Sequence, residues 1–168
     1  MIKQSVSAFA FLIVLVACSG DERSAVTELG IGALKVGMTV AEARKVLASF
    51  DVPAGSGEGC EYATVTGLPP GVRVMVENRT IARIDIDTSL VPTVEGARVG
   101  DSEASVVARY GKRLTVSPHK YTDGHYLTVR PSSPVDTPHR IVFETDKGRV
   151  VKYRAGRLPQ VEYVEGCS

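Results

Sequence analysis

Two stretches of this chain, 63 residues apart, carry nearly the same pattern. KVGMTVAEARKVL (35–47) returns as RVGDSEASVVARYG (98–111), with Val36 lying over Val99. In the first stretch Thr39 and Glu42 form a capping box, in which the threonine hydroxyl and the glutamate carboxylate each accept from the other residue's backbone amide. In the second stretch Ser102 takes the cap position, followed by Glu103, whose negative charge suits a helix N-terminus. The pattern predicts two short amphipathic helices of about ten residues each.

Apolar residues at helical spacing identify the face that each helix should bury. In the first helix they are Ala43, Val46, Leu47 and Phe50, with Pro53 closing the segment, and in the second they are Val106, Val107 and Tyr110, with Gly111 ending the helix. Gly100-Asp101-Ser102-Glu103 also matches the nucleophile block of GDSL-type hydrolases. A helix cap explains both this serine and the threonine of the first stretch, so capping is favoured over a nucleophile.

After each helix the hydrophobic period changes to two, which is typical of antiparallel strands. The runs are 60–66, 71–77 and 80–87 after the first helix, and 112–117, 125–130, 139–145, 148–155 and 160–165 after the second. VMVEN (74–78) matches IVFET (141–145), and IARIDI (81–86) matches VVKYRA (150–155), with an offset that grows because Asp146-Lys147-Gly148 is expected to form a longer turn than Asn78-Arg79.

The predicted unit is therefore one helix and about three strands, used twice, because two such units can bury a sheet face that one would expose. We expect an α+β fold in which one antiparallel sheet of about seven or eight strands carries short helices on one face. Repeat 1 spans 29–95 and repeat 2 spans 96–168.

The first 18 residues read as a signal peptide, because Lys3 precedes an apolar run that is too short for a membrane span. The run ends in Leu15-Val16-Ala17-Cys18, which resembles the bacterial lipobox, whose cysteine is lipidated (palmitate included) and becomes the mature first residue. The alternative is an ordinary secreted protein cleaved near Ala17. Ser19 after the cysteine favours sorting to the outer membrane, facing the periplasm, and 19–28 reads as a polar tether.

Charge and cysteine content narrow the classes of partner. The chain has 20 Lys and Arg against 19 Asp and Glu, so the mature chain without Lys3 is formally neutral. The sequence has no long run of Lys or Arg, so we do not expect a nucleic-acid partner, which would require a basic face. With Cys18 lipidated, Cys60 and Cys167 remain as a pair that should form a disulfide in an oxidising periplasm. Two free thiols or a zinc site are the alternatives, although the sequence has no C-x-x-C motif.

LKVGMTVAEARKVL (34–47) resembles the helix signature of the small outer-membrane lipoproteins of the SmpA/OmlA (BamE) family. The same unit used twice builds the beta-lactamase inhibitor protein fold. These resemblances imply two helix-plus-sheet halves that form one antiparallel sheet, with a concave face that binds another protein. The turn at Asn78-Arg79 lacks the aspartate that the inhibitor presents to its enzyme, and Cys60 and Cys167 would join the two repeats instead of closing each one. The binding residues of neither family transfer to this sequence.

One polar and aromatic cluster, SPHKYTDGHYLTV (117–129), contains His119, Asp123 and His125. A hairpin loop at 123–124 would place the two histidines on opposite faces of the sheet. A loop at 122–124 would pair His125 with Tyr121 and leave His119 as a diagonal neighbour about 7–8 Å away. Neither register makes a set of metal ligands or an acid-base pair, so recognition or plain structure is favoured over catalysis.

Three functions remain open, and none needs a cofactor or a metal. The first is a non-catalytic lipoprotein that binds a periplasmic or outer-membrane protein by its sheet face, as a hydrolase inhibitor or immunity protein. The second is an envelope-assembly lipoprotein of the BamE kind, and the third is a carbohydrate or peptidoglycan binder; a small-molecule ligand is not expected. The candidate partner-binding residues are Tyr121, His125, Tyr126, Arg130, Arg140 and Tyr153.

Overall fold

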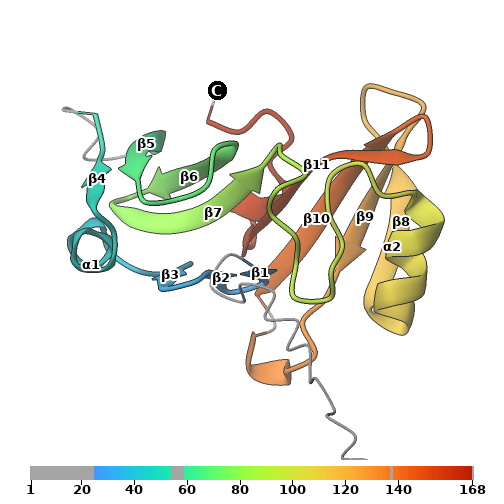
Figure 1. Cartoon of the computed structure of the whole chain (residues 1–168), viewed down its shortest axis with the longest axis horizontal. Helices are drawn as coiled ribbons and strands as arrows, with labels where there is room; N and C mark the ends of the chain where they lie inside the picture. The colour runs from blue at the N-terminus through green and yellow to red at the C-terminus, as the bar shows by residue number, and fades with distance from the viewer. Residues whose placement is uncertain (1–24, 54–58, 137, 168) are drawn as a thin grey trace, which may run out of the picture.

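A computed structural model describes residues 25–53, 59–136 and 138–167, and in this part the chain forms two antiparallel sheets and a few short helices. The larger sheet has eight strands in the order β4-β5-β6-β7-β11-β10-β9-β8 (Figure 1). Its strands are β4 (Ser49–Asp51), β5 (Cys60–Thr66), β6 (Val72–Glu77), β7 (Thr80–Ile86), β8 (Leu114–Pro118), β9 (His125–Val129), β10 (His139–Asp146) and β11 (Arg149–Arg157). The predicted mixed α+β class with one large antiparallel sheet is confirmed.

Each of the two α-helices precedes four strands of this sheet. The helix α1 (Val40–Val46) is followed by β4 to β7, and α2 (Glu103–Tyr110) is followed by β8 to β11. The last strand of each group lies at the centre of the sheet, where β7 and β11 pair with Ile84 opposite Ala155. The two groups therefore meet through their final strands, and β4 and β8 lie at the two edges.

The N-terminus of each helix is tied to a hairpin by the same three backbone hydrogen bonds. At α1, the Gly37 amide donates to Ile81 (2.8 Å), the Ile81 amide donates to Met38 (2.8 Å) and the Val40 amide donates to Arg79 (3.1 Å). At α2, the Gly100 amide donates to Val150 (2.8 Å), the Val150 amide donates to Asp101 (2.9 Å) and the Glu103 amide donates to Gly148 (3.0 Å). These bonds make each cap residue a bridge partner of the hairpin, with Thr39 opposite Thr80 and Ser102 opposite Arg149.

Both predicted caps are confirmed. The Glu42 amide donates to the Thr39 hydroxyl (3.2 Å) and the Thr39 amide donates to the Glu42 carboxylate (2.8 Å), while the Ser105 amide donates to the Ser102 hydroxyl (3.3 Å). Gly111, at φ 53°, ends α2 as expected.

The expected helix lengths and buried faces were partly wrong. The helices have seven and eight residues, and Phe50 is buried in strand β4 instead of in the first helix. Val46 and Val107 were assigned to the buried faces but are 38% and 39% exposed. Helices this short bring only about one turn against the sheet, so the outer positions of each apolar stripe stay in solvent.

The expected difference in turn length was also wrong. Asn78-Arg79 and Lys147-Gly148 are both two-residue turns, and all four residues have positive φ. Two residues of positive φ are what a type I′ hairpin needs. Asp146 belongs to β10, so the hairpin partners of the two halves keep a constant offset instead of a growing one.

A small sheet before α1 was not predicted. It contains β1 (Val26–Thr27), β2 (Gly30–Ile31) and β3 (Leu34–Lys35). Val26 is fully buried, and the Glu28 carboxylate lies 3.0 Å from the Arg113 guanidinium. The end of the predicted tether (19–28) therefore belongs to the folded domain, because its valine is covered by the core.

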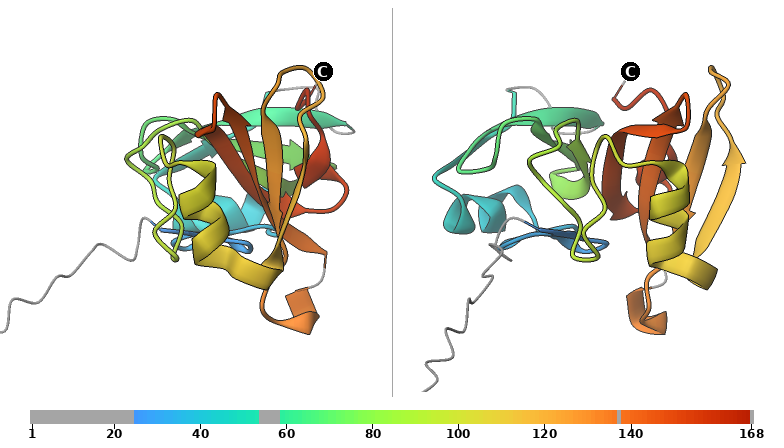
Figure 2. Two further views of the ribbon diagram at one scale, coloured as in Figure 1. Left: turned by 90° about the vertical axis from the view of Figure 1, so that its right-hand side faces the viewer. Right: turned by 45° about the vertical axis from the view of Figure 1, so that its right-hand side comes forward.

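Both helices and β1 to β3 cover one face of the large sheet, which we call the helix face (Figures 1 and 2). The residues that pack there include Val40, Ala43, Val74, Ile84, Ile86, Val106, Tyr110, Leu127, Ile141, Phe143, Tyr153 and Ala155. The other side of the sheet is called the helix-free face. Residues 158–167, which follow β11 and contain the short 3-10 helix η4 (Gln160–Glu162), cross this face near the centre of the sheet.

In the described part of the chain, no helix is both long enough and apolar enough to cross a membrane.

Candidate functional site

The C-terminal segment 158–167 is fixed to the sheet by a disulfide. Cys167 is bonded to Cys60 of β5, with 5.1 Å between the two Cα atoms, so the predicted pairing is confirmed. The expectation of a final strand over 160–165 was wrong. Instead of a neighbouring strand, two buried arginines of the helix-free face, Arg83 and Arg154, donate to carbonyls of this segment.

The first cluster surrounds Arg83 of β7, which is 3% exposed. Its guanidinium donates to the carbonyl of Gln160 (3.0 Å) and to the carbonyl of Tyr163 (2.6 Å). It also pairs with Asp85 (3.0 Å) and donates to the Tyr62 hydroxyl (3.0 Å), which in turn donates to Asp85 (2.9 Å). Burial, and then the Asp85 charge, raise the pKa of Tyr62 above its ordinary value. Arg83 thus joins the sheet to the segment without leaving a buried charge unpaired.

The second cluster surrounds Glu144 of β10, which is 2% exposed. It accepts from Arg154 of β11, from Lys152 (3.0 Å) and from the ring of His119 (3.2 Å). Burial alone raises the pKa of Glu144, but the Arg154 charge and these hydrogen bonds outweigh it and hold the pKa below its ordinary value. Arg154 is 3% exposed, and its Nε donates to the Val161 carbonyl (2.5 Å). The carboxylate therefore fixes the arginine, and the arginine holds the segment.

The side chain of His119 is engaged on both ring nitrogens. Nδ1 accepts from the Tyr121 amide (3.1 Å), so in the neutral ring the proton is on Nε2, which donates to Glu144. The ring stacks on Tyr126 at a centroid distance of 4.5 Å. His125 lies on the helix face, where its Nδ1 is 3.0 Å from Glu103 of α2. The two histidines thus lie on opposite sides of the sheet, which is the arrangement that one of the two suggested loops would have given.

The register behind that separation differs from both alternatives that the sequence suggested. His125 lies opposite Pro118 and Tyr126 lies opposite Ser117, so the connection between β8 and β9 runs from 119 to 124. The hydrogen bond from the His119 amide to the Gly124 carbonyl (2.9 Å) closes it. A Cβ at Gly124 would lie 1.8 Å from the Thr145 carbonyl, so only glycine fits where this loop approaches β10.

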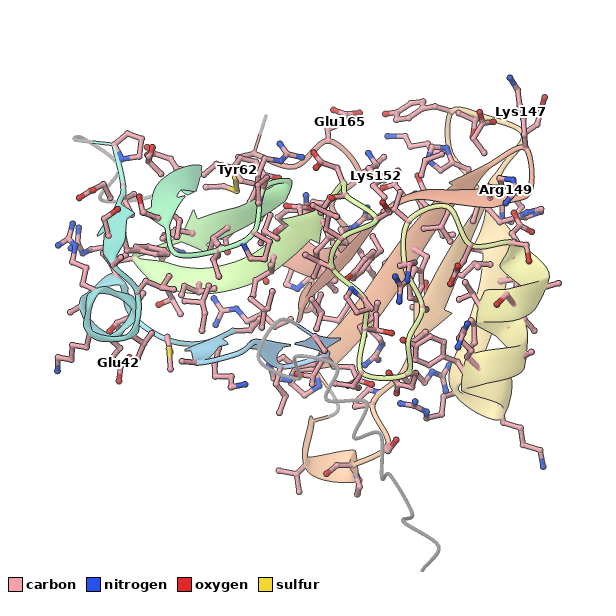
Figure 3. The ribbon with its side chains drawn as sticks, viewed as in Figure 1. Glu42, Tyr62, Lys147, Arg149, Lys152 and Glu165 are labelled. Carbon is pink, nitrogen blue, oxygen red and sulfur yellow. A yellow bond between two sulfur atoms is a disulfide. The ribbon has the colours of Figure 1, made fainter. Side chains whose placement is uncertain are left out.

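Two hollows lie side by side along the C-terminal segment, and Val164 lines both. The first, of about 190 Å³, is lined by Ser117, Tyr126, Thr128, Val142, Arg154, Glu162 and Val164. The second, of about 360 Å³, is lined by Cys60, Lys120, Tyr163, Val164, Glu165, Gly166 and Cys167. We call the two hollows together the Val164 groove. Tyr62, Lys152 and Glu165 lie on this side of the molecule, whereas Glu42 of α1 lies on the other (Figure 3).

The loop 119–124 is held against one rim of the Val164 groove. The Tyr121 hydroxyl donates to Glu165, whose carboxylate also lies 3.7 Å from the Lys120 ammonium. That ammonium sits 4.8 Å from the centre of the Tyr121 ring. Hydrogen bonds from Tyr121 and the charge of Lys120 lower the pKa of Glu165. Tyr121 remains 57% exposed, so an aromatic surface is presented at a defined position.

The predicted partner-binding residues do not form one surface. Tyr121 and Tyr126 lie at the Val164 groove, and Arg130 and Arg140 line a separate hollow of about 120 Å³ on the same face with Pro131, Ser133 and Pro134. His125 is on the opposite face. Asp123 is exposed in the loop, and Cys18 lies outside the described residues.

The placement of Tyr153 on the binding face was wrong. This residue is 1% exposed, lies opposite Phe143 and Ile86, and donates its hydroxyl to the Val91 carbonyl (2.9 Å). Successive side chains of a strand point to opposite faces of the sheet. In β11, Tyr153 points into the core, so its neighbour Arg154 points to the helix-free face. The helix-free face therefore presents Arg154 where Tyr153 was expected.

Sequence reasoning missed Arg83, Asp85, Glu144 and Arg154. Arg83 and Asp85 lie in ARIDID (82–87) and Arg154 lies in VKYRA (151–155), where charged residues alternate with apolar ones. The structure places both runs in the two central strands, β7 and β11, where a charged residue needs a partner if anything covers it.

The described residues contain no group of three or more His, Cys, Asp or Glu side chains placed to hold a metal ion. What the groove offers chemically is a set of hydrogen-bond donors, cations and aromatic rings in fixed positions. Such a set suits recognition of another molecule's polar and apolar groups.

No protein-family model matches the chain, and no curated protein sequence matches it. Among solved structures, the uncharacterized protein YfeY from Escherichia coli is similar with a TM-score of 0.49 and 15% identity, covering 79% of this chain and 99% of YfeY. An extracellular protein containing a SCP domain from Bacillus anthracis has a TM-score of 0.45 and 10% identity. That alignment covers 94% of this chain and 50% of the Bacillus protein.

Proposed function

We propose that this chain is a non-catalytic lipoprotein, anchored in the outer membrane and facing the periplasm, that binds a protein partner on its helix-free face. The observation that carries the proposal is the Val164 groove. Its side chains Tyr121 and Lys120 are held by bonds to Glu165, whose segment the Cys60–Cys167 disulfide fixes, and Tyr126 is held by stacking on His119. Tyrosines are enriched at binding hot spots, and a pre-organised surface loses less entropy on binding.

We further propose that the fold is a duplicated helix-plus-strand unit of the kind found in the beta-lactamase inhibitor protein. The order of one helix and four strands in each half supports this duplication. So do the three matching hydrogen bonds at the two helix N-termini, which join residues at a constant offset within the helices and within the hairpins. The repeated pattern at 35–47 and 98–111 then reflects two copies of one structural unit.

The anchor is proposed from the lipobox and lies outside the described residues. If Cys18 carries lipid, the seven residues from Ser19 to Ala25 reach at most about 25 Å when fully extended. Val26 is already buried in the domain. The groove would then work close to the membrane, and its partner would be an envelope protein.

Two forms of this function differ only in the partner. A secreted or periplasmic hydrolase would make the protein an inhibitor or an immunity protein. Outer-membrane machinery would make it an assembly lipoprotein, as the resemblance to the BamE family implies. The identity of the captured partner separates these two forms.

A glycan or peptidoglycan binder is the second candidate, favoured by the lining of the first hollow. Tyr126 offers a ring on which a sugar can stack, and Ser117 and Thr128 offer hydroxyls beside the Arg154 guanidinium. Calorimetric titration with purified peptidoglycan fragments tests it directly. Binding that is abolished by Tyr126→Ala would favour this candidate over a protein partner.

The test of the main proposal is capture of partners from the native envelope by the tagged full-length chain. Lys120→Glu reverses a charge at the groove, and Lys45→Glu is the matched control on α1, where Lys45 is exposed. We expect Lys120→Glu to weaken capture about thirtyfold if Lys120 is a hot spot worth about 2 kcal/mol, and Lys45→Glu to leave capture unchanged.

Charge reversal at Arg130 or at Arg140 tests the other end of the helix-free face in the same way. If Lys120→Glu leaves capture unchanged and Arg130→Glu weakens it, the binding site is the hollow lined by Arg130 and Arg140. Recovery of no protein partner at all would contradict the proposed function.

A further inference from the structure

We propose that the outer edge of β8 is a docking site for an extended segment of another protein, which adds to the sheet as a ninth antiparallel strand. The β8–β9 hairpin lies at the right-hand end of the sheet in Figure 1, and this end faces the viewer in the left panel of Figure 2. Within the described ranges, β9 is the only strand that pairs with β8. This inference deepens the proposed function and rests on it, because it names the kind of segment that the protein partner would supply.

Hydrogen-bond parity shows which backbone groups of β8 point outward. The Arg130 amide donates to the Arg113 carbonyl, and the His119 amide donates to the Gly124 carbonyl, both at 2.9 Å. In an antiparallel pair, bonded positions alternate along the strand, so Thr115 and Ser117 also face β9. Leu114, Val116 and Pro118 must then direct their backbone groups to the outside.

The outer edge of β8 offers more backbone acceptors than donors. The Leu114 amide is already used by the Gly111 carbonyl, and Pro118 has no amide proton. What remains is one donor, the Val116 N–H, and three acceptors, the carbonyls of Leu114, Val116 and Pro118. In the part of the chain that the structure describes, no hydrogen bond engages these four groups. Thr115, Val116, Ser117 and Pro118 are all exposed, so the edge is open to a partner.

This composition favours a foreign strand over a second copy of the chain. Two copies of β8 paired about Val116 would exchange only two hydrogen bonds, because Leu114 would meet Pro118 and neither amide would be free. A foreign segment without proline can donate three amides to the three carbonyls and accept from Val116, which makes four. The edge is therefore complementary to an extended peptide and poorly complementary to itself.

The edge also lacks the usual protection against strand addition. Exposed edges are blunted by charged side chains, bulges or shortness, and the opposite edge, β4, has three residues with Asp51 exposed and Pro53 two residues later. By contrast β8 has five residues, LTVSP, with no charge and no bulge in its pairing with β9. Only its terminal proline limits pairing, and it does so by removing a donor.

The segment that fits has three properties. It is extended and has no proline at the three residues opposite Leu114, Val116 and Pro118. Its side chains alternate, with an uncharged one over Val116 and polar ones over Thr115 and Ser117, beside the Val164 groove that Ser117 also lines. It carries an acidic residue near its C-terminal end, where an antiparallel strand passes Lys112, which is exposed and has no ion pair among the described residues.

The test uses a random twelve-residue peptide library displayed on phage and the full-length chain in detergent. The tightest selected peptide is resynthesised with a single N-methyl group at each position in turn. Strand addition predicts that three alternate amides are sensitive, each losing about tenfold or more in affinity, and that the amides between them are not. Sensitivity at consecutive positions, insensitivity throughout, or a failure to enrich any peptide would overturn the inference.

Variants of the protein provide the reciprocal measurement. Val116→Pro removes the outward donor without touching a bond to β9, and Val116→Ala removes the side chain but keeps the donor. We expect about tenfold weaker peptide binding for Val116→Pro alone. If Val116→Pro does not fold, the N-methyl scan on the unaltered protein still decides. If the unaltered chain forms a dimer in solution and Val116→Pro dissociates it, the β8 edge binds a second copy of the chain and not a foreign segment.

The same pair of variants separates failure of this inference from failure of the proposed function. If envelope capture yields a protein partner equally with Val116→Pro and with Val116→Ala, the partner binds elsewhere and only the edge inference fails. If the unaltered chain captures no protein, the proposed function itself fails.

Discussion

Replacing Arg154 by methionine should destabilise the fold and loosen the C-terminal segment. The substitution keeps most of the buried volume but removes the charge that faces Glu144 and the donor that faces the Val161 carbonyl. Removing one partner of a buried ion pair typically costs about 3–5 kcal/mol. Lys152 and His119 still contact Glu144, so we expect a value near the lower end, about 3 kcal/mol.

A double substitution shows whether the cost comes from the unpaired charge. In Arg154→Met with Glu144→Leu, no buried charge is stranded. The remaining defects are two neutral groups, the Val161 carbonyl, which the single variant also leaves unpaired, and the Nε2–H of His119. A neutral unpaired group costs about 1–3 kcal/mol, less than a buried unpaired charge. The double variant should therefore be more stable than Arg154→Met alone. Arg130→Met is the matched control, because Arg130 is exposed on the same face, and it should change stability by no more than about 0.5 kcal/mol.

The assay is urea unfolding of the disulfide-intact chain, with the free energy of unfolding obtained by linear extrapolation. Hydrogen exchange provides a local readout, in which the amides of 160–165 should exchange faster in Arg154→Met while those of α1 do not. An Arg154→Met protein within about 1 kcal/mol of the unaltered chain would show that Arg154 does not neutralise a buried charge. So would a double variant less stable than the single one.

Three further predictions concern Glu144, the disulfide and Cys18. The pKa of Glu144 is lowered in the folded state, so its contribution to stability is present above the ordinary value of 4.5 and is lost as the pH falls through the folded value. Below pH 4.5 the free energy of unfolding should therefore drop less steeply in Glu144→Gln than in the unaltered chain. Replacing Cys60 and Cys167 together by serine opens a crosslink with a sequence separation of 107 and should cost up to about 4.7 kcal/mol in denaturant, whereas no measurable loss would show that the segment holds without it. Cys18→Ala should release the protein from membranes into the soluble periplasmic fraction, and continued membrane fractionation would remove the lipid anchor from the proposal.

The helix caps and most strands could be predicted because their causes are local. A hydroxyl residue followed three positions later by a glutamate identifies the start of α1, and period-two runs identify the strands, with 60–66 matching β5 at both ends. The ends of the helices were less predictable. Phe50 has helical spacing relative to Ala43, but it is buried as part of β4 through pairing with Val65, which is a contact that the local pattern does not contain.

The candidate site was less predictable because it depends on where the last ten residues lie. An alternating run such as QVEYVE (160–165) fits a strand by pattern, and only the placement of Arg83 and Arg154 shows that side chains bind its backbone instead. The same placement decides which alternating charges become buried. Tyr153 and Arg154 are neighbours in sequence, and one residue of register determines that the first lies in the core and the second lines the groove.

Photo-crosslinking in the native envelope tests most directly whether a protein partner sits on the Val164 groove. A benzophenone amino acid replaces Tyr121 or Tyr163 at the groove, which are 57% and 36% exposed, or Val107 on α2, which is 39% exposed and lies on the other side of the sheet. We expect a covalent adduct with one envelope protein from positions 121 and 163 and none from position 107. Adducts from position 107 alone, or from none of the three positions, would contradict this expectation.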